Sequence, residues 1–401
     1  MSWFKRTIPD TIFTRLLSAF CKMGIVILTA RYFGTEGRGF IGILAYAMTF
    51  LMLLNEFVGG SSIITLVPTN SIKNLLVPSY VWALIVCVLG YLVLPLFPEV
   101  PIDLHPHIFG LSLLLAFVTI NYSILIGKQK IQWQNWSSLS IVLANLVFLF
   151  VSLVLLHKTD VFYYIYGMYL GEGIGFILSL YLLFKFFGKE LKGRVKVASD
   201  LFKLGILSQT GHLIQFFNYR LSYIFILEYM SQSALGLYST VFVLPETIWI
   251  FGNSIGTVLH MKVVNRKSIQ ESIKMTWKYT LLSIVLTVCM ILLVTLVPSS
   301  FWPWLLGGEF TDVKSLFYWL IPGTIALGVS TCISHYYHAV KRFVVLIYAS
   351  SVGLAIKGSI LLYFSSALSL EIVAQASSLG LVGVSIFLLL KFYIETNNQK
   401  A

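Results

Sequence analysis

Twelve long apolar stretches, each able to cross a lipid bilayer, account for almost the whole of this 401-residue sequence. A spanning helix needs about 20 mostly apolar residues to cross about 30 Å of hydrocarbon. Lipid offers no hydrogen-bond partners, so each stretch must satisfy its own backbone groups and therefore forms a helix. A composition of 58% hydrophobic and 11% charged residues excludes a soluble domain with a polar surface. We predict an all-α, polytopic membrane protein with twelve transmembrane helices.

Short connectors separate the predicted helices, and several of them carry glycine, proline or charged residues. The predicted spans are 9–31, 38–66, 75–97, 107–127, 136–157, 161–187, 202–228, 234–259, 277–298, 313–338, 343–366 and 371–393. Two longer connectors, at 188–201 and 260–276, are basic and have the composition of helices that lie in the membrane interface. No connector is long enough to fold as a separate domain.

Positive charge is distributed unevenly between the two sets of loops. If the N-terminus lies in the cytoplasm, the loops on that side carry twenty lysines and arginines, against four on the other side. Those four are Arg31, Arg38, Lys158 and Lys314. Short cytoplasmic loops are enriched in Lys and Arg, so both termini are predicted to be cytoplasmic. The same loops explain the net charge of +12 without a nucleic-acid partner.

The two halves of the chain resemble one another. Gly39 and Gly236 are 197 residues apart, and so are Gly59 and Gly256. Six predicted spans precede the basic connector and six follow it, so we expect parallel repeats about an axis along the membrane normal. The predicted organisation is an N-terminal six-helix lobe at 1–187, the connector at 188–201 and a C-terminal six-helix lobe at 202–401, around a central cavity.

Three segments carry short patterns that are shared with one transporter family. Phe33-Gly34, Glu36 and Gly39-Phe40 precede a long helix rich in small residues. The stretch 234–238, Ala-Leu-Gly-Leu-Tyr, begins the eighth span, and the stretch 305–310, Leu-Leu-Gly-Gly-Glu-Phe, lies between spans nine and ten. Together with the span count and the loop pattern, these segments resemble the bacterial polysaccharide flippases. Their superfamily also contains multidrug exporters and the lipid II flippase.

The resemblance implies a function and a location. It implies that oligosaccharide repeat units, linked to undecaprenyl diphosphate, cross the bacterial inner membrane by alternating access, for O-antigen and lipopolysaccharide or another surface polysaccharide. The implied partners are this lipid-linked substrate, membrane lipids, a polysaccharide polymerase and chain-length proteins. We expect no enzymatic activity and no cofactor, because the sequence carries no Walker A, GxSxG or zinc motif.

Seven ionisable side chains lie at membrane depth, where a charge is costly and is by default a functional candidate. The basic ones, in spans one, seven and eleven, are Arg15, Lys22, Arg220 and Lys357. The acidic ones, in spans two, six and eight, are Glu56, Glu172 and Glu246. One interpretation is that the cations line the cavity and bind a diphosphate, while the carboxylates balance charge or couple to ion movement. The other is a set of structural ion pairs, with Arg15 reaching the headgroups.

Other features favour structural interpretations. Cys332, His335 and His338 have a spacing that a metal could use, but no acidic or further thiol residue is near them in the sequence, so no metal site is predicted. The glycines at 167, 171 and 175 indicate close helix packing. Pro245, beside Glu246, would either break the eighth span or only bend it.

Two other functions remain open. An exporter of cationic drugs would share the superfamily fold but would be better served by an acidic cavity, whereas basic residues at depth outnumber acidic ones by four to three. An O-antigen polymerase would be an enzyme with a large outer loop. The longest outer connector here has only about 14 residues.

Overall fold

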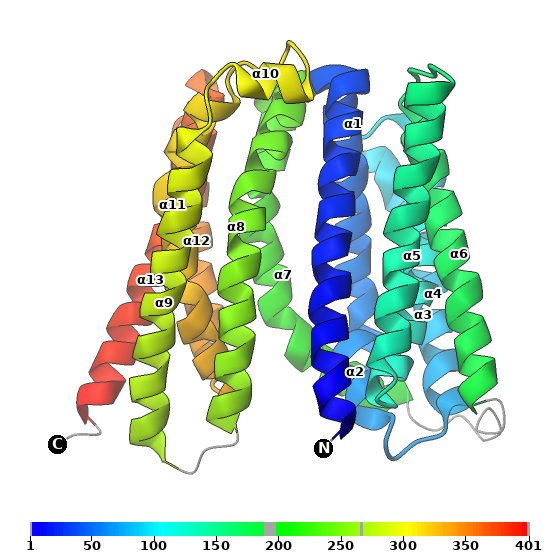
Figure 1. Ribbon diagram of the computed structural model, residues 1–401, viewed down its shortest axis with the longest axis vertical. Coiled ribbons are helices and arrows are strands. Elements are labelled where there is room, and N and C mark those ends of the chain that lie inside the picture. The colour runs from blue at the N-terminus through cyan, green and yellow to red at the C-terminus, as the bar shows by residue number, and fades with distance from the viewer. Residues whose placement is uncertain (1, 188–197, 265–267, 399–401) are drawn as a thin grey trace. The chain divides into compact units, whose positions relative to one another are not determined.

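The computed structural model describes residues 2–187, 198–264 and 268–398, and within these ranges every regular element is a helix (Figure 1). The main helices are α1 (Ser2–Asn55), α2 (Gly60–Leu66), α3 (Ile72–Val93), α4 (His105–Gly127), α5 (Ile131–Leu149), α6 (Phe162–Phe187), α7 (Ala198–Tyr229), α8 (Gln232–Val264), α9 (Ile269–Leu296), α10 (Phe301–Leu306), α11 (Val313–Ala339), α12 (Phe343–Tyr363) and α13 (Leu370–Asn398). Shorter helical turns are η1 (Glu56–Val58), η2 (Leu94–Leu96), η3 (Ile102–Leu104), η4 (Phe150–Leu155) and η6 (Ser365–Ala367).

The apolar helices confirm the prediction of a multi-pass membrane protein. Ten segments of the described chain are long and apolar enough to cross a membrane, and one of them, Leu16–Leu66, is 51 residues long. That segment covers most of the first predicted span and all of the second. Helix α7 is not among the ten, because Gln209, Asn218, Arg220 and other polar residues make it less apolar. Counting the long segment as two and adding α7 gives the twelve predicted spans.

The first two spans are two helices that meet at a kink, at Gly34, within α1. Gly34 has φ 65° and ψ −165°, a conformation outside the helical region, where the absence of a Cβ matters. Arg38 lies beyond this kink, is 7% exposed and donates to Oγ1 of Thr29 at 3.2 Å, across the bend. Arg31 and Arg38, which the sequence assigns to the outer turn between the first two spans, lie on either side of this kink.

The second predicted span is interrupted near its end. Helix α1 stops at Asn55, η1 follows, and the chain resumes as α2 after Gly59. Gly60 has φ +47°, and a Cβ built on it would lie 1.5 Å from Oε2 of Glu56. Gly256, which the predicted repeat pairs with Gly59, lies inside the uninterrupted helix α8 and packs on His335 instead.

One expectation about the second half needs correction, and one open alternative is decided. The connector 260–276 was expected to be an interfacial helix, but α8 continues to Val264 and α9 begins at Ile269. Its two ends therefore belong to long helices. Of the two alternatives for Pro245, the structure excludes a break, because α8 is continuous around it. Most of the other basic connector, 188–201, lies outside the described residues.

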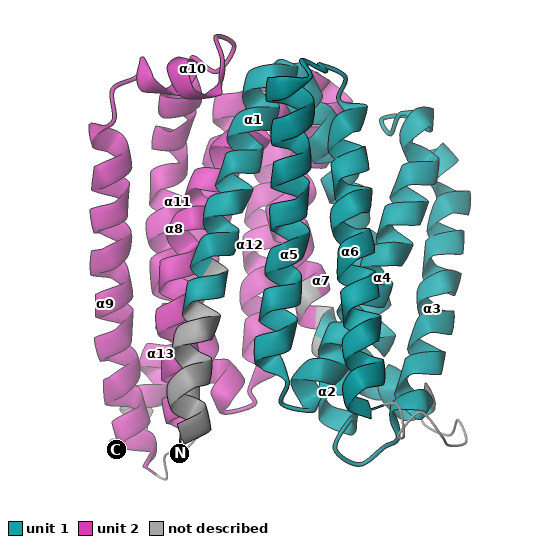
Figure 2. Cartoon of the chain, turned by 45° about the vertical axis from the view of Figure 1, so that its right-hand side comes forward, with its two compact units in different colours: residues 1–210 teal, residues 211–401 magenta. Residues whose placement is uncertain are grey.

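The chain forms two compact units, residues 1–210 (unit 1) and 211–401 (unit 2) (Figure 2). The division falls within α7, whose first turns pack in unit 1: Leu201 joins a core with Val58, Ile72 and Phe187. In unit 2, helix α11 packs on α8, α9 and α13. Its core includes Leu259, Ile333 and Phe392.

Small residues allow close helix contacts in unit 1. A Cβ built on Gly171 of α6 would lie 2.7 Å from the carbonyl oxygen of Ile141 on α5. One built on Gly167 would lie 2.5 Å from Oδ1 of Asn145. The glycines of α6 therefore pack against α5, as the sequence pattern indicates.

Candidate functional site

Arg220 is the centre of a polar cluster in unit 2. Its Nη2 lies 3.7 Å from Oε1 of Glu246 on α8, and its Nη1 donates to the hydroxyl of Tyr223 at 2.5 Å. The guanidinium carbon lies 4.8 Å from the centre of the Tyr223 ring, within the range of a cation–π contact. Tyr223 follows Arg220 by about one helical turn, so α7 itself positions the two side chains together.

This cluster remains partly open. The side chain of Arg220 is 22% exposed and that of Glu246 is 46% exposed. An ion pair at 3.7 Å is near the limit of direct contact, and a partly exposed pair contributes little to stability. The Arg220–Glu246 contact is therefore a weak, partly exposed ion pair.

Lys357 occupies a different environment in the same unit. It is 1% exposed, and its Nζ donates to the backbone oxygen of Asn218 at 2.7 Å, joining α12 to α7. Asn218 Nδ2 donates to the backbone oxygen of Ser350 at 2.7 Å, and Ser350 Oγ donates to Gln215 at 2.8 Å. Lys357 thus belongs to a buried polar seam between these two helices, without surface open to a ligand in this conformation.

A second polar contact in unit 2 was missed by sequence reasoning. Ser222 of α7 and Ser377 of α13 have their hydroxyl oxygens 2.9 Å apart. The hydroxyl of Tyr238 on α8 lies 2.8 Å from Ser377 and 3.3 Å from Ser222. All three residues are buried. Isolated serines and tyrosines in apolar spans give no sequence signal, so only the packing of three helices reveals this cluster.

Unit 1 holds a separate pair of opposite charges. Glu172 of α6 is 9% exposed, and its Oε2 has no hydrogen-bond partner in the described chain. Lys22 of α1 is exposed and interacts electrostatically with this carboxylate, as does the hydroxyl of Tyr122 on α4. The structure therefore brings Lys22 and Glu172 into one cluster. The side chain of Arg15, on the same face of α1, lies outside the described ones.

Glu56 lies apart from these clusters, in the interruption between α1 and α2. It is partly buried, and its carboxylate occupies the space above Gly60. No ion pair involving Glu56 occurs within the part of the chain that the structure describes. The seven predicted residues therefore divide into an Arg220–Glu246 pair, a Lys22–Glu172 pair, a buried lysine, an isolated carboxylate and Arg15.

His335 of α11 makes hydrogen bonds to α8. Nε2 of His335 lies 3.0 Å from Oδ1 of Asn253, and Nδ1 of His260 lies 3.2 Å from the backbone oxygen of His335. Among the described residues, no group of three or more His, Cys, Asp or Glu side chains is placed to hold a metal ion. The histidines link α8 and α11 by hydrogen bonds.

Solved structures with the same fold are transporters and flippases. The lipid II flippase MurJ, in an inward closed conformation, has a TM-score of 0.73 and 17% identity, with 96% of this chain and 87% of that chain covered. A multidrug resistance MATE family transporter of the MOP superfamily, in an inward-facing conformation, has a TM-score of 0.69 and 12% identity, with 96% and 95% covered. These similarities establish the fold.

A third solved structure, the MATE transporter ClbM in complex with Rb⁺, has a TM-score of 0.58 and 14% identity, with 98% of this chain and 95% of that chain covered. The comparison with curated proteins finds no match. A family model described as "Polysaccharide biosynthesis protein" matches residues 11–260, more than half of the chain. The chain is therefore a multi-pass membrane protein with the fold shared by the lipid II flippase MurJ and the MATE transporters, and it belongs to the polysaccharide biosynthesis protein family.

Proposed function

We propose that this protein flips oligosaccharide repeat units, linked to undecaprenyl diphosphate, across the bacterial inner membrane for O-antigen or another surface polysaccharide. The family supports a role in polysaccharide synthesis, and the lipid II flippase with the same fold supports a lipid-linked substrate. Both termini would lie in the cytoplasm, and a polysaccharide polymerase and chain-length proteins would be partners. The protein would move its substrate without catalysing a chemical reaction.

The observation that carries the proposal is the state of Arg220. A charged guanidinium at membrane depth is energetically costly, and such a residue is by default a candidate for a functional site. Arg220 is oriented by Tyr223 but only loosely paired with Glu246, at 3.7 Å. A diphosphate can accept two parallel hydrogen bonds from a guanidinium, which a single carboxylate at this distance does not provide. The substrate would replace Glu246, which would hold Arg220 between transport cycles.

The remaining predicted residues take related roles in the proposal. Lys22 and Arg15 would contribute positive charge from unit 1, with Glu172 as the counter-charge of Lys22 in the empty protein. Lys357 could contact the substrate only in a conformation in which α12 moves away from α7. Glu56 and Glu172 would respond to protons or cations and so couple transport to ion movement.

The second candidate function is an ion-coupled multidrug exporter. The MATE transporters with this fold favour it. So do the carboxylates of Glu56 and Glu172, because neither forms a close ion pair among the described residues. The family model and the partly open arginine favour the lipid-linked anion. A drug-efflux measurement on the same variants distinguishes the two functions.

Replacement of Arg220 tests the proposed function. In a flippase-null strain that expresses the chain, Arg220→Ala should lower surface polysaccharide about tenfold or more, since charge-assisted hydrogen bonds contribute about 1.5–3 kcal/mol. Arg220→Lys should recover only part of this, because Lys binds as a point charge. Polysaccharide is measured by immunoblot and the protein by its level in the membrane.

Arg342→Ala is the matched control. Arg342 also pairs with a glutamate in unit 2, since its Nη1 lies 2.9 Å from Glu395, but its side chain is 56% exposed. Its removal should leave surface polysaccharide unchanged. Wild-type polysaccharide with Arg220→Ala, or loss of drug efflux with no loss of polysaccharide, would contradict the proposal.

A further inference from the structure

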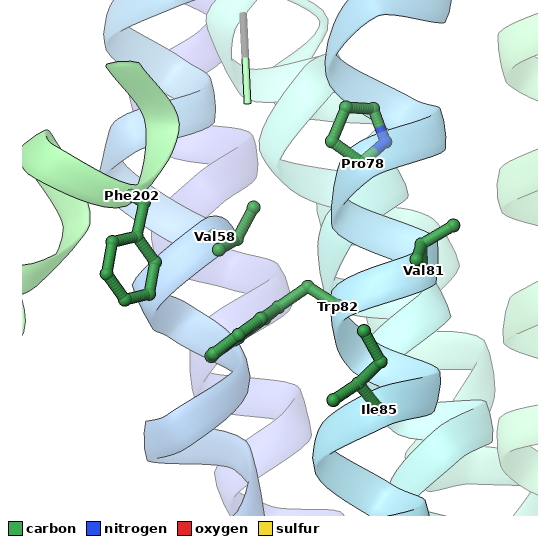
Figure 3. Close-up of a pocket in the computed structure, with 6 residues that line it drawn as sticks. All are labelled: Val58, Pro78, Val81, Trp82, Ile85 and Phe202. Atoms are coloured by element: carbon green, nitrogen blue, oxygen red, sulfur yellow. The ribbon is translucent and has the colours of Figure 1, made fainter. Parts of the chain in front are cut away.

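An apolar groove opens in unit 1 beside the interruption between α1 and α2 (Figure 3). Its volume is about 300 Å³, at the lower end of the range for small-molecule sites. The lining residues come from η1, α3 and the first turns of α7, and they are Val58, Pro78, Val81, Trp82, Ile85 and Phe202. All six side chains are apolar or aromatic, so the groove suits hydrocarbon.

The walls of the groove are held by hydrogen bonds to the interrupted backbone. Carbonyl groups near the end of a helix lack their usual partner. Nε1 of Trp82 donates to the oxygen of Leu54 at 2.9 Å, and Oγ of Ser79 donates to the oxygen of Val58 at 2.5 Å. The rings of Trp82 and Phe202 meet edge to face, with centroids 5.4 Å apart. The groove is therefore preformed and does not depend on a ligand for its shape.

Two lysines lie on the helices that line the groove, near the starts of α3 and α7. Lys203 follows Phe202 directly, and Lys73 lies in the first turn of α3, about one and a half turns before Pro78. Both are exposed, and within the described ranges neither pairs with a carboxylate. Asp200 lies in the first turn of α7. Its single negative charge offsets only one of the two lysines, so the three residues together carry net positive charge.

Further lysines lie at the same end of unit 1. The helices alternate in direction, so the starts of α3, α5 and α7 and the ends of α4 and α6 meet there (Figure 1). Lys128, Lys130 and Lys185 lie over aromatic rings at this end, 5.6, 4.8 and 5.3 Å from the ring centres of Phe187, Phe186 and Trp133. Lysines and aromatic rings together are typical of the level of the lipid headgroups.

We propose that the groove binds an acyl chain of an anionic phospholipid from the cytoplasmic leaflet, with the lipid phosphate held by Lys73 and Lys203. Lysines and aromatic rings at this end are typical of the headgroup level, and the lining residues continue along α3 from Pro78 to Ile85, so head and chain would meet complementary surfaces. An anionic headgroup is favoured over a zwitterionic one, because Lys73 and Lys203 have no carboxylate partner among the described residues. The site is separate from Arg220 and does not depend on the flippase proposal.

Brominated lipids test the site, because bromine quenches indole fluorescence only at close range. The full-length protein is placed in nanodiscs with rising fractions of phosphatidylglycerol that carries brominated chains, or of phosphatidylcholine with the same chains. The signal of Trp82 is the difference between wild type and Trp82→Phe. Phosphatidylglycerol should quench it at a lower fraction than phosphatidylcholine, by about fivefold for each contributing lysine.

Matched variants separate the proposed site from general lipid contact. Lys73→Ala with Lys203→Ala should abolish the preference for phosphatidylglycerol, whereas Lys274→Ala with Lys278→Ala, an equal loss of exposed charge on unit 2, should retain it. Val81→Phe should fill the groove and weaken quenching, whereas Leu84→Phe, exposed on α3 outside the groove, should not. Equal quenching by the two lipids, no quenching of Trp82, or an unchanged preference without Lys73 and Lys203 would overturn the proposal.

Discussion

At the scale of single residues, Arg220 and Lys357 of unit 2 have contrasting environments. Arg220 is partly exposed beside Glu246, whereas Lys357 is 1% exposed and bonded to a backbone oxygen. A buried charge in a membrane helix is expensive, and replacing it with an apolar side chain of similar size is often neutral or stabilising. Stability and function should therefore respond differently to changes at Lys357.

Lys357→Met should keep thermal stability at or above that of wild type and should abolish surface polysaccharide in the complementation strain. Methionine fills the same space without the cost of a buried charge. Lys357→Ala leaves a cavity and should also lower stability, by about 2–5 kcal/mol. Thermal unfolding in detergent and the polysaccharide immunoblot measure the two effects. Full polysaccharide with Lys357→Met would mean that the charge has no part in transport.

At the scale of elements, backbone geometry decides where a span is interrupted. Pro78, Pro245 and Pro322 all lie within continuous helices, because neighbouring groups in a helix bundle can compensate for the missing donor. The interruption occurs instead at residues 56–60, which contain no proline. Here Gly60 has a positive φ and gives space to the Glu56 carboxylate.

Gly60→Ala should lower the free energy of unfolding by about 1–3 kcal/mol, the cost of a strained backbone position for a residue with a Cβ. The new methyl group would also displace the carboxylate of Glu56, 1.5 Å away. Gly173→Ala is the control, because a Cβ there meets no atom within 4 Å. That substitution lies inside α6 and should be neutral or stabilise by up to about 1 kcal/mol. Equal effects of the two changes on the unfolding temperature would refute the strain argument.

At the scale of the whole molecule, the distribution of Lys and Arg predicts how the chain is oriented in the membrane. The loops assigned to the cytoplasm carry twenty of the loop lysines and arginines. Transfer of charged loops across the membrane is unfavourable, so both termini should remain inside. This orientation would also place the lysines beside the apolar groove in the cytoplasmic leaflet.

Single cysteines on a background without the four native ones test the orientation. Lys158→Cys should react with a membrane-impermeant maleimide on intact cells, because its loop is predicted to face outward. Lys274→Cys should react only after the membrane is permeabilised. Both positions are exposed in the structure, so burial would not explain a lack of labelling. The reverse pattern would invert the predicted topology.

The sequence by itself determined the helices, their number and most of their ends. Predicted spans such as 161–187 and 313–338 lie within a few residues of α6 (Phe162–Phe187) and α11 (Val313–Ala339). These properties are local: about 20 consecutive apolar residues suffice to define a span, whatever the rest of the chain does. The sequence also identified the ionisable residues at membrane depth, because a charge within an apolar run is visible without a fold.

Only the tertiary structure decided what those charged residues contact. Lys357 binds the backbone of Asn218, 139 residues away, and Tyr238 meets Ser377 at the same separation. The apolar groove likewise joins Val58 and Trp82 to Phe202, on a helix much later in the chain. Hydropathy carries no information about such contacts, since they depend on which helix faces pack together. The partial exposure of Arg220 and the burial of Lys357 are therefore consequences of packing. In the sequence, both are basic residues within apolar spans, so their different environments cannot be read from it.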